Sequence, residues 1–237
     1  MIKGIPVFMY HKVSPNRVEG KVEKLRVTPE KFDRQMSYLF NHGYKTVTVE
    51  ELINFCEGRL PLTERKIILS FDDGYRDNFL YAFPILQKYN FTAIVFLVSG
   101  CIGSVSEWDE GGAEPLLNWE EIKEMGRGGM EFGSHGHSHR LLPSLSGEEM
   151  RQEIEQSKSI LEKKLGKAVK FFSYPWGKFD ERVKDIVGSC GYRASFSTLP
   201  GKNGRGEDPF ALKRILIRGY DSRLYFLLNL KLGRSRI

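Results

Sequence analysis

The sequence predicts an α/β fold with a parallel sheet. Short apolar runs alternate with helical patterns along the chain, at the spacing of strand–helix units. Roughly seven or eight such units follow one another, which is enough to close a barrel. The chain has 237 residues, a length at which α/β barrels fold as one unit. We therefore expect a single domain over residues 1–237.

Apolar runs bounded by turn residues predict the strands. Their length is typical of strands rather than helices. In chain order the predicted strands are Pro6–Tyr10, Thr46–Val49, Lys66–Phe71, Thr92–Val98, Met130–Ser134, Val169–Tyr174, Ala194–Ser197 and Leu212–Ile217.

The segments between these runs have helical periodicity, and several begin or end at capping residues. Thr28 and Ser146 stand where two of the helices begin, and Gly43 and Gly166 stand where two end. The predicted helices are Pro29–Asn41, Glu50–Glu57, Asp77–Tyr89, Trp119–Met125, Gly147–Leu165, Asp180–Cys190 and Ser222–Leu230. The segment Gly100–Leu117 breaks this rhythm because it is rich in glycine and acidic residues. We expect it to form a long loop that frames a substrate groove.

The composition is that of an ordinary globular protein, with 41% hydrophobic and 28% charged residues. A net charge of +6 favours anionic surroundings, but the basic residues do not form one block. No nucleic-acid motif is present, so no nucleic-acid partner is expected. The three cysteines stand far apart without a CxxC pair, which argues against a disulfide scaffold and against a thiolate zinc site.

Membrane and targeting signals are weak. No stretch approaches ~18 uninterrupted apolar residues, so we expect no transmembrane segment. The N-terminal residues do not form a signal-peptide pattern, which predicts a cytoplasmic protein. A chain whose leader had been removed would look the same, and it would be secreted or held at the cell surface. The last predicted helix has an apolar face followed by basic residues, which would suit either peripheral membrane contact or packing on the core. These residues are Leu224, Phe226, Leu227, Leu230, Lys231, Arg234 and Arg236.

Reactive side chains gather where the predicted strands end. Asp72 and Asp73 end one strand, His135 and His139 follow another, and His11 follows the first. Because the carboxyl ends of parallel barrel strands open on one face, these residues are expected to converge.

Two carboxylates and an H-x3-H pair are the parts of a mononuclear metal site that activates water. His135, His139 and one carboxylate would supply three ligands and leave a position open for water, as catalytic zinc sites do. The two histidines can face one way across a tight loop or one helical turn. Asp72 and Asp73 would point to opposite faces of a strand, so they reach one site only if the backbone leaves strand geometry. Gly74 permits that departure.

Three motifs resemble the signatures of the polysaccharide deacetylases, the NodB-homology proteins of carbohydrate esterase family 4. They are Ser70-Phe71-Asp72-Asp73-Gly74, His135-Gly136-His137-Ser138-His139 and Tyr174-Pro175-Trp176-Gly177. The resemblance covers roughly residues 6–217 and implies a distorted (β/α)7 barrel of the TIM-like kind. It also implies metal-dependent removal of N-acetyl groups from N-acetylglucosamine-type sugars of a polysaccharide or oligosaccharide, with release of acetate.

The resemblance also implies roles for individual residues. The metal, most often zinc, would be held by Asp73, His135 and His139. Asp72 would be the general base, and the backbone amide of Trp176 would help to stabilise the oxyanion. Tyr174 and Pro175 are expected to contact the substrate, an N-acetylated glycan.

The chain departs from the family pattern at two of these motifs. Gly136 replaces the usual Ser or Thr of the second motif. The third motif normally begins with an arginine that orients the catalytic aspartate, and here that position is Ser173. Arg214 in the last predicted strand could approach the same space, and so could Arg76. A structural role at a strand edge is as compatible with the position of Arg214 as the role of orienting the aspartate is.

A third departure concerns the acid that protonates the leaving amine. The family's C-terminal Leu-x-His is absent, since no histidine follows His139. An amide anion is a poor leaving group, so the reaction needs an acid. The segment Met9–Val13 resembles the poly-β-1,6-N-acetylglucosamine deacetylases, in which this acid comes from the N-terminal side. We expect His11 to be the acid; a packed or capping histidine is the alternative.

Other functions remain compatible with these residues. Two histidines and a carboxylate also suit non-haem Fe(II) oxygenases, but such enzymes need no second aspartate beside the ligand. The arginine missing from the third motif would also be compatible with a module that binds glycans without catalysis. Within the hydrolases, a cytoplasmic enzyme could deacetylate or deformylate a lipid-linked or nucleotide-linked amino sugar.

Overall fold

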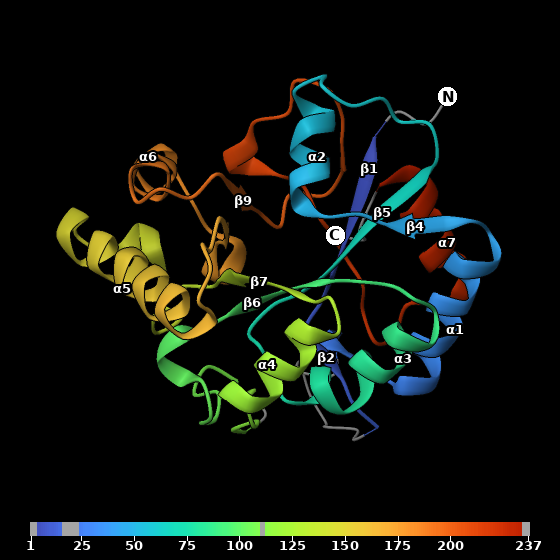
Figure 1. The fold of residues 1–237 in the computed structure, drawn as a ribbon, viewed down its shortest axis with the longest axis horizontal. Coiled ribbons are helices and arrows are strands. Elements are labelled where there is room, and N and C mark those ends of the chain that lie inside the picture. The colour runs from blue at the N-terminus through green and yellow to red at the C-terminus, as the bar shows by residue number, and fades with distance from the viewer. Residues whose placement is uncertain (1–3, 16–23, 110–111, 234–237) are drawn as a thin grey trace.

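One strongly curled sheet forms the centre of the molecule (Figure 1). The computed structural model describes residues 4–15, 24–109 and 112–233. Strands follow the order β10-β1-β5-β6-β7-β8-β9, while β4 pairs with β5 and β11 pairs with β1. They are β1 (Ile5–Tyr10), β4 (Tyr44–Thr46), β5 (Arg65–Phe71), β6 (Ile94–Leu97), β7 (Glu131–Ser134), β8 (Phe171–Ser173), β9 (Ala194–Phe196), β10 (Lys202–Asn203) and β11 (Ile215–Leu216).

The segment from Leu212 to Leu216 touches both ends of this sheet. Leu212 forms a parallel bridge with Phe196 in β9, and β11 pairs in parallel with β1. The neighbours from β1 through β5, β6, β7 and β8 to β9 are all parallel. The predicted α/β fold with a distorted barrel is confirmed, in the form of a curled half-barrel sheet.

Helices surround the sheet, and their ends follow the sequence signals. Helix α1 begins after Thr28, whose side chain accepts a hydrogen bond from the Lys31 amide. Helix α5 begins with a capping box between Ser146 and Glu149 and ends at Gly166, with φ 65°. The helices are α1 (Pro29–Asn41), α2 (Val49–Cys56), α3 (Phe83–Lys88), α4 (Trp119–Arg127), α5 (Gly147–Leu165), α6 (Glu181–Ser189) and α7 (Arg223–Leu232).

The two faces of the sheet bury two apolar clusters. Side chains alternate along a strand, so Val7 lies in one cluster and Phe8 in the other. The first cluster includes α2, which lies near the start of β1 in Figure 1. The second contains buried residues of α1 and α3 to α7, which cover the outer face. Burial on both faces explains why β1 reads as a continuous apolar run.

Some predicted elements differ in the structure. The helix predicted over Asp77–Tyr89 splits into a π-helical turn, Asn78–Ala82, followed by α3. Pro84 lies in the first turn of α3 and has no N–H for a regular helical bond, which accounts for the irregular turn.

Two strand predictions also need correction, and β10 and one further strand pair were not predicted. The strand predicted at Thr46–Val49 was displaced, because Thr48 instead caps α2 through a capping box with Glu51. The strand predicted at Leu212–Ile217 shortens to β11. A small parallel pair, β2 (Lys12–Val13) and β3 (Arg26–Val27), was not predicted.

The apolar face predicted on helix α7 lies mostly against the core, which is one of the two expected arrangements. Phe226 and Leu230 are buried in the core and Leu227 is half-buried, whereas Leu224 is exposed. Residues packed in the core are not free to enter a membrane. Arg234 and Arg236 lie outside the described residues. Among the described helices, none has the length and apolarity needed to cross a bilayer.

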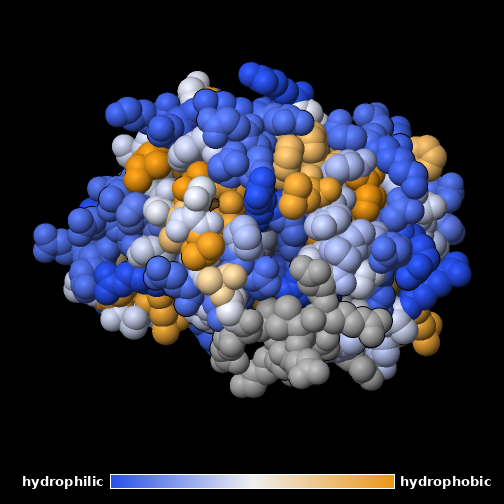
Figure 2. All heavy atoms as spheres, turned by 90° about the horizontal axis from the view of Figure 1, so that it is seen from below, coloured by the Kyte–Doolittle hydropathy of each residue, from blue (hydrophilic) through white to orange (hydrophobic). Residues whose placement is uncertain are grey.

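The strand register aligns the predicted reactive residues. Tyr10 in β1 lies beside Phe71 in β5, and Ser134 in β7 lies beside Leu97 in β6 and Phe172 in β8. The residues that follow these strands therefore share one rim, at the carboxyl end of the sheet. Figure 2, which views the molecule from below, shows apolar side chains exposed in patches on either side of central hydrophilic residues.

Candidate metal centre and active site

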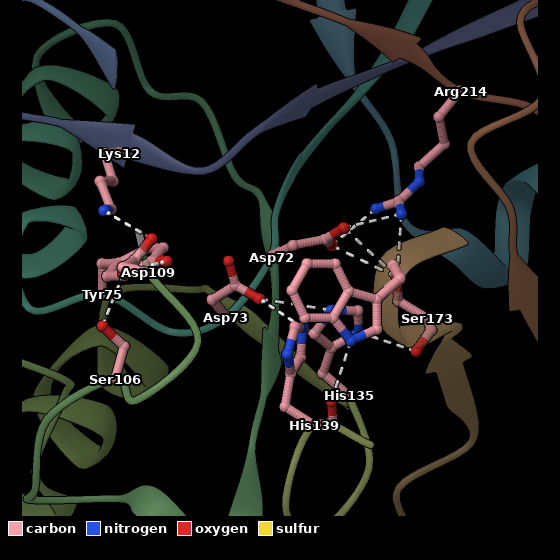
Figure 3. Close-up of polar contacts among 11 residues, drawn as sticks. Lys12, Asp72, Asp73, Tyr75, Ser106, Asp109, His135, His139, Ser173 and Arg214 are labelled. Atoms are coloured by element: carbon pink, nitrogen blue, oxygen red, sulfur yellow. Dashed lines mark hydrogen bonds and ion pairs between the residues drawn. The ribbon is translucent and has the colours of Figure 1, made fainter. Parts of the chain in front are cut away.

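Asp73, His135 and His139 converge on one point at this rim (Figure 3). The Oδ1 atom of Asp73 lies 3.4 Å from Nε2 of His135 and 3.3 Å from Nε2 of His139. All three side chains are buried, and their candidate ligand atoms lie within 4.8 Å of one another. Two imidazole nitrogens and a carboxylate oxygen are a ligand set that divalent transition metals accept. The three residues could therefore hold a metal ion.

Left-handed backbone brings these side chains together. Asp73 has φ 71° and Gly74 has φ 72°, so the chain leaves strand geometry directly after β5, as predicted. His139 and Trp176 also have positive φ, at 59° and 62°. Within the described ranges, Asn90 is the one other non-glycine residue with positive φ. Such backbone is sterically costly, and here it is concentrated at the site.

The ring of His135 is oriented for metal binding by its own hydrogen bond. Its Nδ1 lies 2.8 Å from the backbone oxygen of Ser173. A carbonyl oxygen can only accept, so Nδ1 carries the hydrogen and Nε2 keeps a free lone pair facing Asp73. Metal-binding histidines usually have such an acceptor behind them.

The ring of His139 is held differently, by two indoles. Trp108 packs against it with ring centroids 4.3 Å apart, and Trp176 with centroids 5.0 Å apart. The indole N–H of Trp176 donates to the backbone oxygen of His139 at 3.1 Å. The Nδ1 atom of His139 is buried and has no hydrogen-bond partner among the described residues.

Asp72 lies beside this cluster and is bound by Arg214, which is fully buried. Two guanidinium nitrogens of Arg214 donate hydrogen bonds to the two carboxylate oxygens of Asp72, at 2.7 and 2.8 Å. Ser173 lies in the same network, because its hydroxyl accepts from Arg214 at 2.9 Å. Burial alone would raise the pKa of Asp72, but the charges of Arg214, His135 and His11 and the hydrogen bonds from Arg214 together outweigh it, so the pKa is lowered.

The choice between the two candidate arginines is therefore clear in the geometry. Arg76 instead pairs with Glu121 at 2.7 Å, away from Asp72. The small side chain of Ser173 stands where the family usually has an arginine, and Arg214 reaches the same carboxylate from beyond β9.

His11 belongs to the same rim. The charges of Asp72, Asp73 and Arg214 all act on its imidazole, which places it within electrostatic reach of the cluster. Burial lowers the pKa of His11, and the two aspartates offset only part of that effect. Asn78 donates to its backbone oxygen at 2.8 Å. Within the described residues, Nδ1 of His11 is buried without a hydrogen-bond partner.

In the third motif, Tyr174–Gly177, some side chains are buried in the core and others lie at the surface. Tyr174 is fully buried, and its hydroxyl donates to the backbone oxygen of Phe210 at 2.8 Å. Pro175 is buried as well. Both side chains are therefore packed beneath the rim, and their contact with a substrate stays a prediction. Trp176 is 53% exposed and does face outward.

Two anchors of the site were not predicted. Glu153 in α5 accepts from the backbone amide and the hydroxyl of Ser138, which fixes the loop between the two histidines. Gly136 has φ 79°, and an added Cβ would come within 3.2 Å of Glu153. A glycine therefore suits this position better than the family's usual Ser or Thr.

The second anchor holds the loop that carries Trp108. Lys12 is buried and forms an ion pair with Asp109 at 3.0 Å (Figure 3). Tyr75 and Ser106 donate to the same carboxylate, at 2.8 and 2.6 Å. Asp109 belongs to no motif, and the segment Met9–Val13 gave Lys12 no role, so only their meeting in space identifies this pair.

Sequence comparison finds one family. A model described as polysaccharide deacetylase matches residues 59–195. The chain is 29% identical to the protein YxkH of Bacillus subtilis (strain 168), over 90% of this chain and 71% of that protein. It is 25% identical to the poly-β-1,6-N-acetyl-D-glucosamine N-deacetylase of Staphylococcus aureus, over 83% of this chain and 69% of that enzyme.

Solved structures agree with this match. The Streptococcus pyogenes deacetylase PplD, solved in complex with acetate, superposes with a TM-score of 0.82 and 28% identity, covering 96% of this chain and 98% of that one. IcaB from Ammonifex degensii gives the same TM-score at 23% identity, with 98% of each chain covered, and supports the fold alone.

Proposed function

The chain belongs to the polysaccharide deacetylase family, and we propose that it is a metal-dependent hydrolase that removes N-acetyl groups from N-acetylglucosamine-type sugars of a glycan. The observation that carries this proposal is the pairing of two buried centres at one rim. One is the ligand set Asp73, His135 and His139; the other is Asp72, held by Arg214. A relative named as a poly-β-1,6-N-acetyl-D-glucosamine N-deacetylase supports a β-1,6-linked glycan as the first substrate to test.

Asp73, His135 and His139 would hold a divalent ion, most often zinc in this family, which would supply Lewis acidity and lower the pKa of water towards roughly 7. Asp72 accepts the proton of the attacking water. Its two oxygens are already aligned by Arg214, so the carboxylate is ionised and oriented before the substrate arrives. Ser173 adds a hydroxyl to the same network.

The remaining residues act on the acetyl group and the leaving nitrogen. The backbone amide of Trp176 donates to the oxygen that becomes negative as water attacks the carbonyl. Protonated His11 then donates to the departing nitrogen, so that the C–N bond breaks to give a free amine and acetate. Both groups lie on the rim that carries the ligand set.

Acetate release tests this proposal. The purified protein is incubated with β-1,6-linked and β-1,4-linked N-acetylglucosamine oligomers and with peptidoglycan fragments, with chelator and after zinc is restored. We expect release that chelator abolishes and zinc recovers, and we expect Asp72→Asn to lack it. Binding of these glycans without acetate release would indicate a binding module. Iron and dependence on 2-oxoglutarate would instead indicate an oxygenase.

A further inference from the structure

Two buried cations and two carboxylates form a cluster beside the candidate metal centre. Lys12 and Arg26 are paired residues of β2 and β3, and both are buried. The ammonium nitrogen of Lys12 lies 3.0 Å from a carboxylate oxygen of Asp109 and 3.7 Å from one of Glu114. Arg26 also pairs with Glu114. Because buried charges need partners, the cluster fixes the chain segments that carry these side chains relative to one another.

The ammonium group of Lys12 has a closely defined place in this cluster. It lies 4.4 Å from the centroid of the Tyr75 ring, on the face of that ring. Tyr75 and Ser106 both donate to the Asp109 carboxylate, which Lys12 meets from another side (Figure 3). Lys12 is therefore held between an aromatic face and a carboxylate whose own position is fixed.

Each partner of the Lys12–Asp109 pair is the chain neighbour of a residue of the site. Trp108 directly precedes Asp109, and its ring packs on His139 with centroids 4.3 Å apart. His11, the proposed acid, directly precedes Lys12. One ion pair thus connects the segment that carries the acid with the segment that supports a candidate metal ligand.

The imidazole of His11 is positioned through its backbone. Its Nδ1 has no hydrogen-bond partner among the described residues, whereas its backbone oxygen accepts from Asn78 at 2.8 Å. The next residue along the chain is Lys12, at the start of β2. The place of the ring therefore depends on where Lys12 is held.

We propose that Lys12 is a positioning residue for deacetylation, which acts through its two neighbours in the ion pair and in the chain. By binding Asp109 it sets the place of His11 relative to the candidate metal centre. The two ends of the scissile amide need different groups, because the carbonyl reacts at the ligand set and the nitrogen takes its proton from the acid. A misplacement of about 1 Å between such groups can cost a factor of about 10² in rate.

This inference rests on the proposed deacetylase function and predicts a selective loss. An amide nitrogen leaves with a proton from the acid, whereas the phenolate of an aryl acetate leaves without one. Substitution of Lys12 should therefore slow the release of acetate from an amide and spare its release from an aryl ester. General loosening of the site would slow both reactions.

The test measures kcat/KM of Lys12→Met for an N-acetylglucosamine oligomer and the chelator-sensitive kcat/KM for 4-nitrophenyl acetate, both at saturating zinc. We expect the amide rate to fall by about ten- to a hundredfold and the ester rate to stay near the wild-type value. Lys12→Arg keeps the charge and should recover most of the amide rate. Asp109→Asn keeps the shape of the acceptor and should reproduce the loss, so the outcome does not depend on the folding of Lys12→Met.

Lys158→Met is the matched control. Lys158 also pairs with a carboxylate, that of Glu162 at 2.7 Å, and also lies over a tyrosine ring, that of Tyr192 at 4.9 Å. None of these three residues has a role in the proposed reaction. This variant should keep both rates.

A double-mutant cycle with His11→Gln tests whether Lys12 acts through the acid. If it does, the losses in amide rate from Lys12→Met and His11→Gln should be far from additive. Additive losses would overturn the positioning role, and so would equal losses of the amide and ester rates in Lys12→Met. Wild-type amide rates in both Lys12→Met and Asp109→Asn would also overturn it.

Zinc affinity gives a readout that needs no turnover. Competition with a chromophoric chelator, starting from metal-free protein, should show zinc binding about tenfold weaker in Lys12→Met, as expected for the loss of a ligand's support. Adding Trp108→Ala should weaken it little further, and unchanged affinity in Lys12→Met would overturn the connection through Trp108. A wild type that releases no acetate from any glycan overturns the deacetylase function, whereas an active wild type with unselective variants overturns this inference alone.

Discussion

The two aspartates at the end of β5 are neighbours in the chain, but the groups that neutralise them differ. Asp72 is neutralised within the protein, because Arg214 donates to both of its oxygens. Asp73 instead faces two imidazole nitrogens at 3.3 and 3.4 Å, which are neutral ligands when they keep their lone pairs. The negative charge of Asp72 is therefore already balanced by the positive charge of Arg214. The charge of Asp73 could be balanced by a metal ion, which would leave Asp72 for the chemistry and Asp73 for ion binding.

Replacing each aspartate by asparagine should separate these two functions and give the largest effect. Asp72→Asn removes the base, so acetate release should fall by about 10² to 10⁴ while the bound metal is retained. Asp73→Asn should lose both the metal and the activity. Metal content after dialysis and acetate release measure the two outcomes. Near-wild-type turnover in Asp72→Asn would show that the base lies elsewhere.

Removing Arg214 tests how far Asp72 depends on its partner. Arg214→Met leaves a buried, unpaired carboxylate, so we expect a loss of about 3–5 kcal/mol in the free energy of unfolding. Arg214→Lys should lose less, because it keeps the charge but not the bidentate contact. Urea unfolding at equal metal loading measures this.

Arg76→Met is the control for that experiment. Arg76 pairs with Glu121 and its side chain is 49% exposed, so the same substitution should cost at most about 1 kcal/mol. Equal losses at the two arginines would contradict the distinction between a fully buried pair and one whose arginine is half-exposed.

The sequence revealed the residues that lie in local motifs. Asp72, Asp73, His135 and His139 were found because each pair stands together at the end of a predicted strand, and parallel strands bring those ends to one rim. Helices α1 and α5 were predicted to the residue, since caps mark their ends.

Residues that act across long separations could not be found in this way. Arg214 lies 142 positions from Asp72, and spacing alone did not separate it from Arg76. Glu153 is one of several acids on α5, and only its burial against Ser138 distinguishes it. The burial of Tyr174 was also not predicted, because a motif shows which residues occur together, but not which side of the backbone each side chain takes.

The two histidines of the candidate metal centre offer a finer comparison. His135 is oriented by a hydrogen bond to the Ser173 backbone, whereas His139 relies on packing against Trp108 and Trp176. Trp108→Ala should therefore weaken metal binding by about tenfold, at the lower end of what loss of a ligand's supporting contact costs. Competition with a chromophoric chelator measures this affinity.

Trp119→Ala is the control for the tryptophan experiment. Trp119 is also half-buried, but it lies in α4 with the Lys164 ammonium over its ring. We expect its substitution to leave metal affinity unchanged. A similar weakening in both variants would mean that general loosening, and not the contact with His139, is responsible.

The smallest expected effect concerns the pKa of His11, which the charges of both aspartates raise. Burial lowers the pKa of His11 below its ordinary value of about 6.5, although both carboxylates oppose the shift. The pKa of Asp72 is also lowered, so the base is already ionised where His11 titrates. The proposed mechanism needs Asp72 ionised and His11 protonated together. As pH rises, kcat/KM should first increase as Asp72 loses its proton, and then decrease as His11 loses its own at a pH below about 6.5.

A pH profile of kcat/KM at saturating zinc measures both limbs, because this parameter reports the free enzyme. Charge from the two carboxylates partly supports the protonated imidazole, so Asp72→Asn, followed through its residual activity, should move the alkaline limb to still lower pH. His11→Gln should remove that limb and reduce the rate. An alkaline limb well above pH 6.5 that persists in His11→Gln would assign the leaving-group proton to another donor. In that case the two aspartates would still serve the same water, but His11 would not be the acid that protonates the leaving nitrogen.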